Sequence, residues 1–122
     1  MTTYRPEMWV VLEIKYQTQT IYKILTTSYG GYTQGDSWKL SSGIESLSIE
    51  GDDYVMPNSS GSIYYCPKNL MCYKMGSYTR SIYNGWLENS MVGRYQIRIL
   101  DYSEIPNLNL MLEEEFKNRP TQ

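Results

Sequence analysis

The chain has 122 residues and a net charge of −2, from 11 basic and 13 acidic side chains. This balance provides no basic field that would hold nucleic acid phosphates, so we expect no direct nucleic acid binding. Because the chain contains no histidine, it lacks the commonest metal ligand and the base of the usual catalytic triads, and we expect no metal site, no cofactor and no enzyme activity.

The length fits one domain, residues 1–122, with enough chain to bury a core. The most apolar run, residues 8–12, is far shorter than the ~20 residues that span a bilayer, and the first residues lack the order of a signal peptide. We therefore expect a cytosolic protein. In that compartment Cys66 and Cys72 are expected to be reduced rather than bridged.

The first elements in chain order are a leader and two strands. Residues 1–7 are expected to be a loose, flexible leader, because Pro6 removes a hydrogen-bond donor and no apolar period is present. Residues 8–16 alternate with a period of two, which is typical of a half-buried strand. Residues 21–26 form a second strand, and the short loop between the two predicts an antiparallel hairpin.

Shorter strands follow, separated by stretches rich in glycine, serine, aspartate and proline that favour turns. They are predicted at residues 37–40, 44–50, 54–56 and 62–66. The first half of the chain is therefore predicted to be an antiparallel meander of five or six strands.

The period changes after Gly76. Tyr78, Ile82 and Trp86 are spaced four residues apart, which predicts an amphipathic helix through about residue 90. Residues 94–100 alternate again and predict a late strand.

The last segment, residues 103–117, predicts a C-terminal helix, with one apolar face formed by Ile105, Leu108, Leu112 and Phe116. Glu113, Glu114 and Glu115 oppose the helix dipole, so this end is expected to fray or to meet a basic partner.

These elements together predict an α+β fold. An antiparallel sheet from the first half carries one packed helix and is followed by a late strand and a C-terminal helix. The alternating late strand and the separable last helix favour self-association, as a homodimer or a higher homo-oligomer.

Residues 28–46 concentrate glycines, aromatic rings and hydroxyls. Gly30 and Gly31, between Tyr29 and Tyr32, permit positive φ and a close approach of another molecule to the backbone. The serines and glycine of residues 41–43 offer hydroxyl and N–H groups of the kind from which anion-binding nests are built.

Three motifs carry a resemblance: "YGGY" at residues 29–32, "GDSWKLSSGI" at residues 35–44 and "GSIYYCPK" at residues 61–68. In these, the chain resembles a family of small proteins encoded by tailed bacteriophages, over about residues 9–78. Relatives more often carry arginine where this chain has Lys39 and asparagine where it has Ser41. Lysine is a point charge and lacks the planar fork with which arginine makes a bidentate phosphate contact.

By analogy, the chain is similar to phage anti-defence proteins such as the Thoeris anti-defence proteins, which sequester cyclic ADP-ribose-type signals without degrading them. This resemblance implies a counter-defence protein of the host cytoplasm that binds a nucleotide-derived immune signal, either a cyclic ADP-ribose isomer or a cyclic dinucleotide. Such a ligand needs an aromatic plate, cations or N–H donors, and hydroxyls. We expect these from Tyr29, Gly30, Gly31, Tyr32, Ser37, Trp38, Lys39, Ser41, Ser42, Tyr64, Lys68 and Arg80.

Structural interpretations compete with this one. Trp38 also fits a core position, Gly30 and Gly31 also fit a hairpin turn, and Cys66 fits a small buried apolar residue. Asp36 with Asp52 and Asp53 could act as an acid/base pair, but no nucleophile or metal ligand accompanies them.

Two other functions compete with signal sequestration. One is a protein-binding inhibitor of a host defence effector, such as a nuclease or a CRISPR effector, that uses a tyrosine-rich face and the acidic tail. The other is a virion accessory protein.

Overall fold

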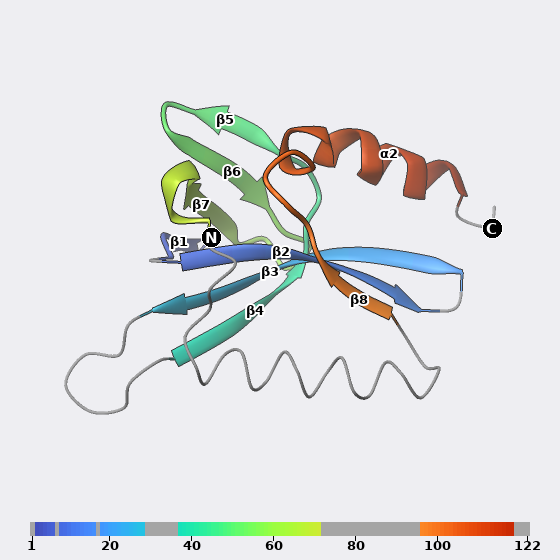
Figure 1. Ribbon diagram of the computed structural model, residues 1–122, viewed down its shortest axis with the longest axis horizontal. Coiled ribbons are helices and arrows are strands. Elements are labelled where there is room, and N and C mark those ends of the chain that lie inside the picture. Colours follow the sequence, from blue (N-terminus) through green and yellow to red (C-terminus); the bar gives the residue numbers. More distant parts are fainter. Residues whose placement is uncertain (1, 7, 17, 29–36, 72–95, 119–122) are drawn as a thin grey trace.

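The structure is a computed structural model that describes residues 2–6, 8–16, 18–28, 37–71 and 96–118 (Figure 1). Most of the described residues lie in short strands. The elements are β1 (Thr3–Tyr4), β2 (Met8–Tyr16), β3 (Gln19–Ser28), β4 (Ser37–Gly43), β5 (Ser48–Glu50), β6 (Asp53–Pro57), β7 (Ile63–Pro67), η1 (Lys68–Leu70), β8 (Gln96–Ile99), η2 (Ile105–Asn107) and α2 (Leu108–Asn118).

The strands form two four-stranded sheets, with the orders β4-β3-β2-β8 and β1-β7-β6-β5. All pairings are antiparallel except that of β1 with β7. The α+β class, the late strand and the C-terminal helix are confirmed. The first-half strands, predicted as one meander, are divided between the two sheets. The helix predicted at residues 78–90 lies outside the described residues.

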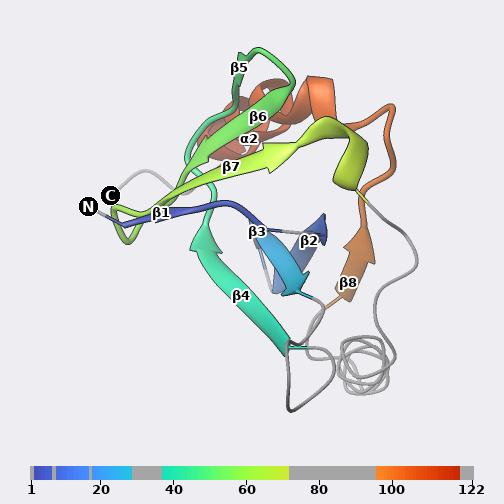
Figure 2. The same ribbon diagram turned by 90° about the vertical axis from the view of Figure 1, so that its left-hand side faces the viewer.

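The main core lies between the two sheets, which face each other in Figure 2. Trp9, Val11 and Ile24 of the first sheet meet Met56 and Cys66 of the second, and each of these side chains is at most 1% exposed. Burial of Cys66 confirms its interpretation as a small apolar residue and raises the pKa of its thiol.

Strand β2 is buried on both faces, which corrects the expectation of a half-buried strand. Its odd residues Trp9 and Val11 belong to the main core, whereas Val10 and Leu12 belong to a second cluster on the other face of the sheet. All four side chains are at most 1% exposed. Alternation in the sequence is weak here because both parities are apolar up to Leu12, which is typical of a central strand.

The segment expected to be a loose leader, residues 1–7, contains a short strand. Thr3 and Tyr4 form β1, which pairs in parallel with Ile63 and Tyr64 of β7. Arg5 then places its guanidinium 4.6 Å from the centre of the Tyr65 ring and 3.1 Å from Asp53 Oδ2. Backbone pairing with β7, with added contacts of Arg5, thus forms a strand in a segment whose own sequence has no strand period.

The chain crosses from the first sheet to the second at residues 43–45. The backbone N–H of Ile44 donates to the Tyr22 carbonyl of β3 at 2.7 Å, and the next N–H, of Glu45, donates to the Pro57 carbonyl of β6 at 2.8 Å. The N–H of Ser59 returns to the Gly43 carbonyl at 2.8 Å. The end of β4 is thus shared by both sheets and forms a corner between them.

The C-terminal segment begins with a 3-10 turn containing Pro106 near its start, where proline is tolerated, and continues as α2. Ile105 and Leu108 are fully buried, as predicted, and Leu112 packs at the edge of the main core. The side chain of Phe116 lies outside the described residues. Within the described part of the chain, no helix is long and apolar enough to cross a membrane.

Candidate binding cleft

Several predicted ligand-binding residues lie outside what the structure describes. These are Tyr29, Gly30, Gly31, Tyr32 and Arg80, together with the side chains of Ser37, Trp38 and Lys39, whose backbone forms the first part of β4. Four predicted site residues are fully described: Ser41, Ser42, Tyr64 and Lys68.

Ser41 is a structural residue, which corrects its assignment to a ligand shell. The pairing of β3 with β4 shifts register between Lys23 and Leu25. At this irregularity the Ser41 Oγ accepts the Ile24 N–H at 2.8 Å and donates to the Ser42 carbonyl at 2.7 Å. Ser41 is only 4% exposed, so its hydroxyl completes the sheet instead of reaching outward.

Tyr64 is a core residue, which corrects its assignment as a base-stacking ring. It is 2% exposed, and its ring stacks on Tyr4 with centroids 4.8 Å apart. Burial raises the pKa of its hydroxyl to about 12. A ligand could stack on this ring only by opening the core.

Ser42 and Lys68 lie near opposite ends of strand β7. Ser42 accepts the backbone N–H of Ser60, in the turn between β6 and β7, at 3.1 Å. Lys68 follows β7 and places its Nζ 5.4 Å from the centre of the Tyr54 ring. The strands of the hairpin separate these positions by about 13 Å or more, at roughly 3.3 Å per residue.

Ser42 instead borders a cleft of about 880 Å³. One wall is the first half of β3, a second is the corner where β4 ends, and the third is α2. The lining residues are Thr20, Ile21, Tyr22, Lys23, Ser42, Gly43, Ile44, Glu45, Ser59, Asn109, Leu112, Glu113 and Glu115. Figure 1 shows the first half of β3 extending past the end of β4, below α2.

The lining of the cleft combines apolar residues with three glutamates, and these glutamates form the acidic rim. Ile21, Ile44 and Leu112 supply apolar surface, and Ile21 is 39% exposed. Among the described lining residues, the carboxylates of Glu45, Glu113 and Glu115 outnumber the single ammonium of Lys23. A positively charged ligand therefore complements this cleft, and a phosphate meets like charge.

The β3 wall contains an open strand edge. On one side β3 pairs with β2 from Gln19 onward, but on the other side its ladder with β4 begins only at Lys23. No strand in the described part of the chain pairs with residues 19–21 on that second side. The backbone N–H of Thr20 donates instead to Glu115 Oε1 of α2 at 2.8 Å.

A second side chain of α2, that of Asn109, also makes hydrogen bonds to backbone groups, as a neighbouring strand would. Asn109 Oδ1 accepts the Leu47 N–H at 2.8 Å, and its Nδ2 donates to the Leu47 carbonyl at 2.8 Å. Leu47 directly precedes β5, so Asn109 caps the backbone at the start of that edge strand. The side chains of Asn109 and Glu115 thus attach α2 to the backbone of Leu47 and of Thr20 in β3.

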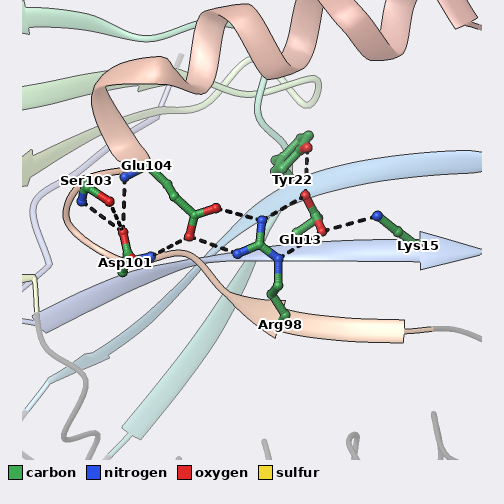
Figure 3. Close-up of polar contacts among 7 residues, drawn as sticks. All are labelled: Glu13, Lys15, Tyr22, Arg98, Asp101, Ser103 and Glu104. Atoms are coloured by element: carbon green, nitrogen blue, oxygen red, sulfur yellow. Dashed lines mark hydrogen bonds and ion pairs between the residues drawn. The ribbon is translucent and has the colours of Figure 1, made fainter.

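A polar network that joins buried Tyr22 and Glu13 to the half-exposed Arg98 lies beside the cleft (Figure 3). Tyr22, Glu13 and Arg98 stand directly opposite one another on β3, β2 and β8. The Tyr22 hydroxyl donates to Glu13 Oε2 at 2.9 Å, and burial together with this bond raises the pKa of Tyr22. Because Tyr22 also lines the cleft, the network fixes part of the cleft wall.

Among the described residues, no group of three or more carboxylate or thiol side chains is arranged to hold a metal ion. Of the three aspartates considered for acid/base work, Asp52 lies in the turn between β5 and β6, and Asp53 begins β6 and is paired with Arg5. Asp36, the third, lies outside the described residues.

No family model, curated protein or solved structure matches the chain. The resemblance to small tailed-phage proteins therefore stays a prediction from the three sequence motifs.

Most of the cleft cannot be predicted from the sequence. The roles of its lining residues depend on contacts between segments far apart in the chain, as for Thr20, Lys23, Glu45 and Asn109. One signal was available in the sequence: the acidic run that includes Glu113 and Glu115 was expected to fray or to meet a basic partner. Its position against the open edge of β3 could not be read from local spacing.

Proposed function

We propose that this chain is a binding protein whose target is another protein, and that the cleft receives a positively charged segment of that target. This is the second of the functions expected from the sequence. The observation that carries it is the composition of the cleft lining, which contains three carboxylates, one ammonium and several apolar residues. Like charges placed together at an interface cost several kcal/mol, so this cleft disfavours a phosphate.

The proposed mechanism needs affinity alone. The partner's basic side chains would meet the acidic rim while its apolar side chains cover Ile21 and Leu112. Occupying a partner in this way would inhibit it without any chemical step. If the phage resemblance holds, the partner would be a host defence effector.

Sequestration of a nucleotide signal stays a prediction that rests on residues 29–32 and on the side chains of Trp38 and Lys39. Its test is a titration with cyclic dinucleotides and ADP-ribose isomers, followed by recovery of unmodified ligand after heat denaturation. Unchanged nucleotide binding by Lys39→Ala would rule out the phosphate contact assigned to that lysine.

The test of the proposed function is selection from a randomised peptide display library on the immobilised protein. We expect lysine and arginine to be enriched over the input library, and free peptides of the enriched sequences to compete for binding. Selection without enrichment of basic residues, together with micromolar binding of a nucleotide, would contradict the proposal. Sedimentation velocity on the same preparation tests the predicted self-association.

A further inference from the structure

We propose that the basic segment binds by β-strand addition, as an extended strand that pairs with the open edge of β3 at residues 19–21. This inference rests on the proposed function and specifies how the same cleft is used. Strand addition supplies affinity through main-chain hydrogen bonds and selectivity through alternate side chains.

The first support is the geometry of the edge. Strand β3 already has a partner on its β2 side at Ile21, Thr20 and Gln19, which holds the edge in extended form. On the cleft side, the ladder with β4 begins only at Lys23. An added strand would continue the line of β4 along β3, in the space that the cleft leaves between β3 and α2.

The second support is the contact that now occupies this edge. Glu115 Oε1 accepts the Thr20 N–H at 2.8 Å, in the place where the carbonyl of a neighbouring strand would accept it. Unpaired strand edges are commonly protected by side chains or covering elements, and here the protecting group comes from the acidic rim.

These two features imply that the incoming strand exchanges with Glu115 as the hydrogen-bond partner of Thr20. A carbonyl of the incoming strand replaces Glu115 on the Thr20 N–H, and the released carboxylate pairs with a lysine or arginine of the same strand. Glu45 and Glu113, on two walls of the cleft, are available for further basic side chains at alternate positions. The occupant is therefore an extended segment that alternates basic and apolar residues.

The test uses three synthetic heptapeptides and fluorescence anisotropy or heteronuclear NMR titration of the full chain. The first is acetyl-Lys-Val-Lys-Val-Lys-Val-Lys-amide, the second has glutamate in place of each lysine, and the third is the lysine peptide with alternate backbone amides N-methylated. We expect the lysine peptide to bind and the glutamate peptide not to bind. N-methylation should weaken binding by at least about tenfold, because it removes main-chain donors and leaves the charge unchanged.

A matched pair of variants tests the protein side. Thr20→Pro removes the N–H that faces the cleft, and proline is tolerated at such an edge position, whereas Thr20→Ala keeps the N–H. We expect the lysine peptide to lose at least about tenfold in affinity for Thr20→Pro and little for Thr20→Ala. The N-methylated peptide keeps the question open to test even if Thr20→Pro fails to fold.

The outcomes distinguish failure of strand addition from failure of the proposed function, which is binding of a basic segment of another protein. Equal binding of the methylated and unmethylated lysine peptides would overturn strand addition while leaving a basic partner in place. Failure of the lysine peptide to bind, with basic peptides still enriched from the display library, would also overturn strand addition. If the library yields no basic peptides, the proposed function itself fails.

Discussion

Glu13 of β2 lies directly opposite Arg98 of β8, with Arg98 Nε 3.2 Å from Glu13 Oε1. Glu13 is 8% exposed, and a buried carboxylate is tolerated only when it is paired and hydrogen-bonded. Arg98 also bonds to Glu104, with its Nη2 2.7 Å from Glu104 Oε2. One guanidinium thus joins the first sheet to the turn that leads into α2 (Figure 3).

Removing this guanidinium should destabilise the fold. We expect Arg98→Ala to lower the free energy of unfolding by about 1–3 kcal/mol, because Glu13 is left buried with fewer partners while the half-exposed arginine is partly screened. Arg98→Lys keeps the charge but loses the fork, and should recover part of the loss. Urea denaturation measures both variants. Equal stabilities of Arg98→Ala and the wild type would show that the network contributes nothing.

The same network predicts a loss of stability in acid. The Arg98 guanidinium, aided by the Asp101 N–H, lowers the pKa of Glu104. A carboxyl whose pKa is lower in the folded state stabilises the fold above its unfolded pKa, and this contribution is lost as the pH falls through the folded pKa. The free energy of unfolding should therefore decline from about pH 5 to about pH 3.

Glu104→Gln should show a shallower decline than the wild type over that range. The matched control is Glu50→Gln, which changes an exposed side chain of β5 by the same charge and should keep the wild-type slope. Urea denaturation at a series of pH values gives the slopes. A Glu104→Gln slope as steep as that of the wild type would contradict the assignment.

Ser41 and Ser42 are adjacent in sequence but should respond differently to substitution. Ser41→Ala leaves the buried Ile24 N–H without its acceptor and should cost about 1–3 kcal/mol of stability. Ser42 is half-buried and bonds to the exposed Ser60, so Ser42→Ala should change stability by about 0.5 kcal/mol or less. Thermal denaturation of the two variants compares them, and a neutral Ser41→Ala would contradict the role given to its hydroxyl.

Most strands other than β1 were predictable from sequence, because apolar and β-branched runs bounded by turn residues are local signals. Residues 8–16 were predicted as a strand with the bounds that the structure has for β2, and the hairpin with β3 followed from the short loop. The division into two sheets was not predictable, because it depends on the corner at Ile44, where one residue bonds to β3 and the next to β6. Strand period does not specify which sheet a strand joins.

The candidate site was less predictable than the fold. Ser41 and Tyr64 have side chains that could contact a ligand, but both are buried in the folded chain. The cleft combines residues from β3, the corner after β4 and α2, so its acidic rim exists only in the folded chain. The part of the site that the sequence did indicate is the run of carboxylates in α2, because their charge can be recognised without knowing how the chain packs.

That carboxylate run offers a matched pair of variants for the binding proposal. Glu115 lines the cleft and bonds to Thr20, whereas the neighbouring Glu114 is exposed and is not among the lining residues. Glu115→Gln should weaken binding of the lysine heptapeptide by about two- to fivefold, the range for one partly exposed ion pair. Glu114→Gln removes the same charge and should leave affinity nearly unchanged. Equal losses in both variants would indicate attraction by net charge rather than by the cleft.

The central claim is that the cleft accepts a basic extended segment and rejects a polyanion. Its most direct test is NMR titration of the uniformly ¹⁵N-labelled chain, with the lysine heptapeptide in one series and cyclic ADP-ribose isomers and cyclic dinucleotides in the other. We predict that the peptide shifts the amide resonances of Thr20, Lys23 and Glu45 at the cleft, and that the nucleotides leave them in place. Nucleotide-induced shifts at these amides, with no effect of the peptide, would contradict the account.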